Sequence, residues 1–154
     1  MTGAITLFID ADACPVKDEV YRVAQRYGLQ VYVVANAYIQ VPVHPKIARV
    51  VVEAGPDIAD DWIAERVAPG DVAITSDIPL AERVLKAGAA AIAPNGRPFT
   101  VDSIGSAIAQ RAIMEQIRST GAITGGPKPF DRNDRSRFLQ TLDETIVRAM
   151  RGRR

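Results

Sequence analysis

Close to its start the chain reads Ile5-Thr6-Leu7-Phe8-Ile9-Asp10-Ala11-Asp12-Ala13-Cys14-Pro15-Val16-Lys17. The first five residues are mostly branched or aromatic and lack polar alternation, a pattern typical of a strand buried on both faces of a parallel sheet. Asp10 and Asp12 follow where this strand ends, and open α/β sheets bind ligands outside the carboxyl ends of their strands. Pro15 suits the first turn of a helix, which apolar spacing continues to Gly28. The segment therefore predicts a strand, an acidic turn and a helix.

The alternation of strand and helix continues along the chain. Further buried strands are predicted at residues 31–35, 47–52, 72–75 and 89–93. Further helices are predicted at residues 58–67, 79–87, 104–118 and 136–150, with Asp102 or Ser103 as the cap of the third. This order predicts an α/β fold with a mainly parallel central sheet.

Length and composition set the class of protein. The chain has 154 residues, of which 47% are hydrophobic and 24% charged, so we expect one domain over residues 1–154. Within it, residues 121–154 are predicted to be a Gly/Pro-rich connector and a basic C-terminal helix. The single cysteine excludes an intramolecular disulfide, and no apolar run approaches the roughly 20 residues of a membrane span. With no signal-like start, a cytoplasmic protein that does not bind membranes is expected.

The net charge of +1 conceals an uneven distribution. Residues 1–104 contain 9 Lys/Arg and 13 Asp/Glu, a balance of −4, whereas residues 105–154 contain 10 and 5, a balance of +5. A basic segment beside an acidic site suits a polyanionic substrate, although basic tails are often only solvated surface.

Acidic residues recur where predicted elements begin and end. They are Asp10, Asp12, Asp57, Asp60, Asp61 and Asp77. In a parallel sheet the strand-end acids converge on one edge, and grouped carboxylates repel one another unless a hard cation such as Mg²⁺ or Mn²⁺ neutralises them. Such a site can activate water and stabilise a phosphoryl transition state. The alternative is that each Asp only caps a helix or turn.

Three other residues are of types that often take part in catalysis or binding. Cys14 precedes a helix and could be a nucleophile, but no second cysteine is present to resolve it, which favours packing. His44 has no acid or cysteine at ligand spacing, which favours a surface loop. Trp62 falls on the apolar side of its helix, which favours the core.

Basic residues gather in and after the segment Thr124-Gly125-Gly126-Pro127-Lys128-Pro129. Paired glycines free backbone N–H groups, so this segment could hold an anion, but a flexible connector fits the composition equally well. The residues predicted to contact phosphate or nucleic acid are Lys17, Ser76, Lys128, Arg132, Arg135 and Arg137.

Several motifs resemble one family over nearly the whole chain. They are Asp10-Ala11-Asp12-Ala13-Cys14-Pro15, Gly55-Pro56-Asp57-Ile58-Ala59-Asp60-Asp61-Trp62, Thr75-Ser76-Asp77-Ile78-Pro79-Leu80-Ala81, and Gly125-Gly126-Pro127-Lys128-Pro129-Phe130 with Asp134-Arg135 and Phe138. Together they resemble the YaiI/YqxD family of uncharacterised bacterial proteins, which is itself similar to the PIN-like and 5′-nuclease superfamily. This resemblance implies a three-layer PIN-like domain that binds Mg²⁺ or Mn²⁺ and cuts phosphodiesters.

The resemblance also implies roles for residues. Asp10, Asp12, Asp61 and Asp77 would be catalytic, these four with Asp57 and Asp60 would bind metal, and single-stranded RNA would be the substrate by analogy with PIN domains. Ile58 and Pro79 stand where 5′-nucleases often have acids, so fold and metal binding are better supported than fast turnover.

Two alternatives remain at this stage. A nucleic-acid-binding protein with a vestigial metal site fits the missing acids and the basic tail. A haloacid-dehalogenase-type phosphohydrolase fits Asp10-Ala11-Asp12, but Cys14 replaces the usual Thr or Val, and Asp60-Asp61 precede rather than follow Thr75 and Lys86.

Overall fold

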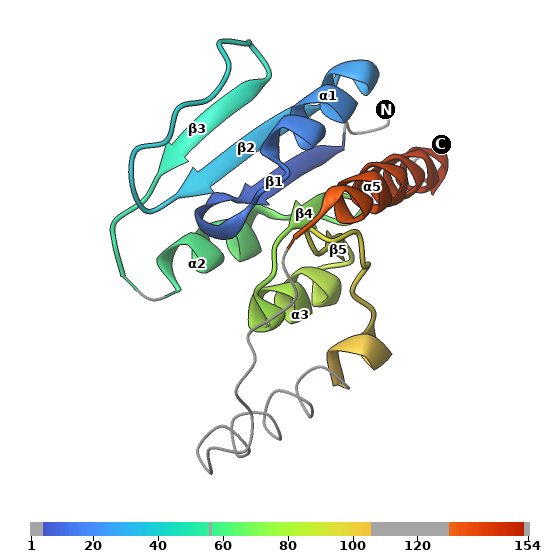
Figure 1. Ribbon diagram of the computed structural model, residues 1–154. Coiled ribbons are helices and arrows are strands. Elements are labelled where there is room, and N and C mark those ends of the chain that lie inside the picture. The colour runs from blue at the N-terminus through green and yellow to red at the C-terminus, as the bar shows by residue number, and fades with distance from the viewer. Residues whose placement is uncertain (1–4, 56, 106–129, 153–154) are drawn as a thin grey trace.

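The computed structural model describes residues 5–55, 57–105 and 130–152 (Figure 1). In this part of the chain one sheet contains β1 (Thr6–Asp10), β2 (Gln30–Ala35), β3 (Ile47–Val51), β4 (Val72–Ile74) and β5 (Ala90–Ile92). The strand order is β3-β2-β1-β4-β5, and each of these neighbouring pairs is parallel. The predicted α/β fold with a parallel sheet is confirmed.

Helices cover both faces of the sheet (Figure 1). The elements are the short 3₁₀ turn η1 (Ala11–Ala13) and the helices α1 (Lys17–Tyr27), α2 (Ile58–Arg66), α3 (Ile78–Lys86) and α5 (Arg132–Gly152). The helices α1 and α5 lie on one face, and α2 and α3 lie on the other. The three layers agree with the PIN-like arrangement that the resemblance implies.

The burial of β1 explains why its sequence lacks polar alternation. Leu7 and Ile9 pack in the cluster that includes Phe138 of α5, whereas Phe8 packs in the opposite cluster with Ile63 of α2. Successive side chains of a strand point to opposite faces, so a strand covered on both sides must be apolar throughout. The strand can therefore carry a carboxylate only where it ends.

Most element boundaries agree with the predictions to within one or two residues, and the larger differences have identifiable causes. The first long helix begins at Lys17 and not at Pro15, because Val16, with a φ of −115° and a ψ of 27°, is the N-cap and its carbonyl accepts from Val20 N at 3.1 Å. Residues 101–105 are helical and are capped by Thr100, not by Asp102 or Ser103: the Thr100 hydroxyl accepts from Ser103 N at 3.0 Å, and Thr100 N donates to Ser103 Oγ at 2.7 Å. The remainder of the helix predicted over 104–118, and residues 121–129 of the connector, lie outside the described residues.

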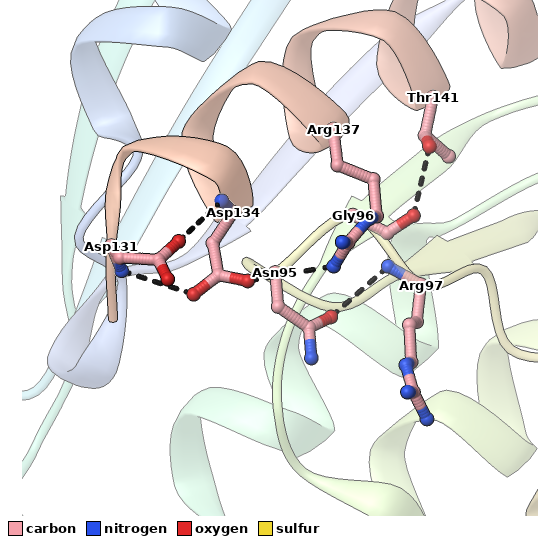
Figure 2. A network of polar contacts seen from close by, with 7 residues as sticks. All are labelled: Asn95, Gly96, Arg97, Asp131, Asp134, Arg137 and Thr141. Carbon is pink, nitrogen blue, oxygen red and sulfur yellow. Dashed lines mark hydrogen bonds and ion pairs between the residues drawn. The ribbon is translucent and has the colours of Figure 1, made fainter. Parts of the chain in front are cut away.

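The last helix begins at Arg132, four residues before the predicted Ser136, because two aspartates cap it. Asp131 N donates to Asp134 Oδ2 at 3.0 Å, and Asp134 N donates to Asp131 Oδ1 at 2.9 Å (Figure 2). This reciprocal pair satisfies two backbone donors at the helix start, as a capping box does. The helix therefore has a fixed N-terminal end.

Other predictions concern single residues. Cys14 is buried, and burial raises the pKa of its thiol, which agrees with a packing role. Trp62 packs against Phe8 and Tyr32 beneath the sheet. His44 lies in the loop before β3, where its Nδ1 accepts from Lys46 N at 3.0 Å. No helix in the described ranges is both long and apolar enough to cross a membrane.

The turn after β5 packs closely on α5 (Figure 2). Thr141 donates its hydroxyl to the carbonyl of Gly96 at 2.8 Å. Gly96 has a φ of 90°, and a Cβ there would lie 2.7 Å from backbone atoms of Arg137 and Phe138. Only glycine allows both this conformation and this approach.

We predict that Gly96→Ala lowers the free energy of unfolding by about 3 kcal/mol, the sum of left-handed strain and overpacking against a backbone that cannot move away. Gly28→Ala is the matched control, because Gly28 has a φ of 67° but nothing within 4 Å of its added Cβ. Its cost should be the strain alone, about 1 kcal/mol. Urea denaturation of both variants measures the difference, and equal costs would show that the approach to α5 is not tight.

Candidate active site

The strand order has a switch point between β1 and β4, and the acidic residues lie at the carboxyl ends of these two strands. From β1 the chain builds outward through β2 and β3, and then returns to the other side of β1 with β4 and β5. At such a switch point the two connections diverge, which leaves room for a ligand. The pairing of Ile9 with Ile74 places Asp10 opposite Thr75 at this edge.

Thr75 joins the two strand ends chemically. Its hydroxyl donates to Asp10 Oδ2 at 2.8 Å and accepts from Asp77 N at 3.0 Å. Asp77 in turn caps α3, because its Oδ1 accepts from Leu80 N at 2.8 Å. Thr75 is 1% exposed, so these hydrogen bonds satisfy an otherwise buried hydroxyl. The network fixes Asp10 and leaves its second oxygen available.

The carboxylates of this edge act on one another. Burial raises the pKa of Asp10, the hydrogen bond from Thr75 opposes that rise, and the charges of Asp12 and Asp77 add to it. Burial followed by the charges of Asp77, Asp10 and Asp57 raises the pKa of Asp60 to about 6, against a smaller opposing effect of Arg83. The structure therefore brings Asp10, Asp12, Asp57, Asp60 and Asp77 into one electrostatic group.

Asp61 is ion-paired and is not among the charges that shift the pKa of Asp10 or Asp60. Its Oδ1 lies 2.7 Å from Nη1 of Arg83 in an ion pair whose side chains are about half exposed. Asp12 lies at the other end of the edge, where its Oδ1 accepts from Asn36 N at 3.4 Å. Asp57 precedes α2 with a φ of 67° and makes no side-chain cap.

The carboxylates of this edge are the residues that a metal ion would need as ligands. Among the described residues, no three side chains of His, Cys, Asp or Glu are close enough to form a metal-binding group. Mg²⁺, however, keeps several waters and binds through one or two carboxylates in many enzymes. The donors at this edge are all carboxylate oxygens, the type of ligand that a hard cation prefers, but among the described residues they form no three-ligand group.

Comparisons with known proteins match this chain over most of its length. The model of the uncharacterised YaiI/YqxD family matches residues 8–148, which run from within β1 into α5 and include the acidic edge. The chain belongs to the YaiI/YqxD family. A UPF0178 protein of Caulobacter sp. (strain K31) is 66% identical over 145 residues, covering 94% of this chain and 96% of the relative. A UPF0178 protein of Rhodopseudomonas palustris (strain TIE-1) is 60% identical over 154 residues, covering 99% and 98%. No solved structure matches the chain.

In this YaiI/YqxD protein the first and last motifs meet. Arg135 of α5 donates through Nη1 to the carbonyl of Pro15 at 2.9 Å and to Glu19 Oε2 at 3.1 Å. Its guanidinium also lies 5.0 Å from the centre of the Phe130 ring. Lys17 donates to the neighbouring carbonyl of Cys14 at 2.7 Å. The side chains of Lys17 and Arg135 therefore bind the backbone carbonyls of Cys14 and Pro15, just after the acidic turn.

The residues predicted to contact phosphate are distributed unevenly. Lys17 and Arg135 make the internal contacts just described, and Arg137 lies 3.5 Å from Asp134. Ser76 and Arg132 are exposed, and Lys128 lies outside the described residues. Phosphate binding by these residues stays a prediction, but two of them also have a positioning role.

Sequence reasoning assigned no site role to Thr75. The available signal was that Thr75 follows a buried strand, as Asp10 does, so neighbouring strands would place the two side chains together. The partnership of Arg135 with Glu19 had no local signal, because 116 residues separate them.

We predict that Arg135→Ala lowers the free energy of unfolding by about 1–3 kcal/mol. Glu19 would keep its charge while 8% exposed, but the partial exposure of Arg135 keeps the loss below the roughly 3–5 kcal/mol of a fully buried pair. Arg132→Ala removes an exposed arginine from the same helix and should change stability by about 0.5 kcal/mol or less. Chemical denaturation compares them, and equal values would mean that Arg135 is an ordinary surface residue.

We predict that Asp60→Asn stabilises the metal-free protein at neutral pH. The pKa of Asp60 rises on folding from 3.8 to about 6, so the folded state holds this proton more tightly and loses stability as the pH rises through that interval. The variant should therefore melt above the wild type at pH 7, by roughly 2–4 °C per kcal/mol of relieved repulsion, and the difference should disappear near about pH 4.

Thermal melts in EDTA from pH 4 to 8 measure this effect. Glu53→Gln is the control, because Glu53 is exposed and is not among the charges that act on Asp60. It should leave the pH dependence of the wild type unchanged. A pH-independent difference between wild type and Asp60→Asn would contradict the proposed repulsion.

Proposed function

We propose that this protein is a divalent-metal-dependent phosphodiester hydrolase that acts on single-stranded RNA. The observation that carries the proposal is the gathering of carboxylates at the carboxyl ends of β1 and β4, where Thr75 bonds to Asp10 and to the backbone of Asp77, and where the charge of Asp77 raises the pKa of both Asp10 and Asp60. Carboxylates with raised pKa values are common at functional sites, where the shifted proton affinity serves binding or catalysis. The resemblance to PIN-like nucleases gives the reaction class.

The residues of the chain have distinct parts in this proposal. Asp10 and Asp77 would hold Mg²⁺ or Mn²⁺ together with its bound waters, because one or two carboxylates are enough for a hydrated ion, with Asp12, Asp57 and Asp60 beside them. The bound ion would supply an activated water and would offset charge on the phosphoryl group. Thr75 orients Asp10 through its hydroxyl, which fixes one carboxylate oxygen before substrate arrives.

Asp60 is suited to proton transfer. A pKa of about 6 lets its carboxylate accept a proton from water near neutral pH and release it again. Because Asp61 is paired with Arg83, we assign it a structural contribution to α2 and α3 in place of the catalytic role first predicted.

A second candidate function is nucleic-acid binding with a vestigial site. Pro79 favours it, because a proline at the start of α3 supplies no metal ligand where related nucleases often have an acid. Basic residues near the start of α5 would contact phosphate in either case.

We predict slow, Mn²⁺-preferring cleavage of labelled single-stranded RNA that Asp10→Asn reduces at least 100-fold. Mg²⁺ should support less activity, because it demands stricter octahedral geometry and the site offers few protein oxygens. Glu53→Gln is a matched control, since it removes an exposed carboxylate near the same edge that takes no part in the group. Wild type and both variants are purified in parallel.

Each outcome of this assay is informative. Equal cleavage by wild type and Asp10→Asn identifies a contaminating nuclease and refutes the hydrolase proposal. If none of the preparations cuts RNA or DNA while wild type binds RNA, the binding-protein function replaces it. Hydrolysis of an aryl phosphate without cleavage of RNA would instead favour a phosphohydrolase of the haloacid-dehalogenase type.

A further inference from the structure

An exposed aromatic side chain lies on the loop between β2 and β3. Tyr38 is 73% exposed, yet the guanidinium of Arg49 lies 4.3 Å from the centre of its ring. Arg49 is itself anchored, because its Nη1 donates to the carbonyl of Ile39 at 3.4 Å. The ring is therefore held from one side while most of its surface remains in solvent.

This loop begins at the acidic edge. Asn36 N, at the start of the loop, donates to Asp12 Oδ1, and Tyr38 follows two residues later. Figure 1 shows the loop leaving β2 beside the end of β1 and returning along the outer side of β3. A strand of nucleic acid with a phosphate at the acidic edge would therefore pass close to Tyr38.

The charge of Arg49 restricts what would bind here. Within the described part of the chain, Arg49 forms no ion pair with a carboxylate. An aromatic ring beside an uncompensated guanidinium suits a ligand that has both a flat π-surface and negative charge. A nucleotide has both, whereas an apolar protein surface would leave the guanidinium desolvated without a partner.

We propose that Tyr38 and Arg49 form a stacking platform for one base of a single-stranded RNA, which rests on the proposed function by naming how its substrate is held. The open face of Tyr38 stacks on the base, and Arg49 reinforces the ring from the opposite face. Because the ring is held before binding, little conformational freedom is lost. Stacking accepts any base, so the platform adds affinity without sequence preference.

The test is RNA binding without turnover. Fluorescence anisotropy measures a short labelled single-stranded RNA at low salt, where phosphate contacts are strongest, once in EDTA and once in Mn²⁺ over times shorter than cleavage. Tyr38→Ala should weaken binding roughly 5- to 100-fold, the range measured for loss of one stacked base. Tyr38→Phe keeps the ring and should bind like wild type. Val43→Ala is the control for loss of exposed apolar surface, because Val43 is fully exposed on the same loop.

A strand in which the bases are replaced by abasic sites separates stacking from phosphate contact. Wild type and Tyr38→Ala should bind this strand equally. Three results would overturn the platform: no binding by wild type, no effect of Tyr38→Ala, or an equal loss on normal and abasic strands. A dimer of wild type that Tyr38→Ala separates, seen by sedimentation with RNA binding unchanged, would assign the surface to a second copy and also overturn it.

The two proposals fail in different ways. If cleavage does not depend on Asp10, the hydrolase proposal fails while the binding comparison of Tyr38 variants still stands. If cleavage depends on Asp10 but Tyr38→Ala binds normally, only the platform fails.

Discussion

The direction of the strands is the constraint from which the site follows. All described strands of the sheet run the same way and the central ones are covered on both faces, so their interiors must be apolar. Ionisable groups are excluded from β1 until Asp10 and from β4 until after Ile74. Parallel pairing then brings these positions together at one edge. The same packing that stabilises the fold therefore concentrates its carboxylates, and burial there raises the pKa of Asp10 and Asp60.

The edge is held in place from two directions. On one side Asp77 caps α3 and Thr75 connects that cap to Asp10, so the start of a helix is linked to the end of a neighbouring strand. On the other side α5 reaches the acidic turn through Arg135 and Glu19. Each device satisfies polar groups that would otherwise be buried without partners. Rigid support of this kind suits a site in which repelling groups must stay close.

The fold was largely predictable because its signal is local. The apolar run before Asp10 and the proline near the start of α3 specify their elements within a few residues. The convergence of the acids followed from parallel strands alone. Partners across the fold were not predictable in the same way: Arg83 for Asp61, and Glu19 for Arg135, depend on how helices distant in sequence pack. The start of α5 was also missed, because its cap uses Asp131 and Asp134 reciprocally where the apolar spacing begins only later.

The position of α5 has a consequence for the order in which the protein can fold. Phe138, Leu142 and Ile146 complete the core on one face of β1, although β1 is the first strand synthesised. At about 5–20 residues per second, the ribosome needs roughly 6–25 s to add the chain between these elements. During that time Leu7 and Ile9 lack their final cover. The core on this face of the sheet is therefore complete only after α5 has been synthesised and has packed against β1.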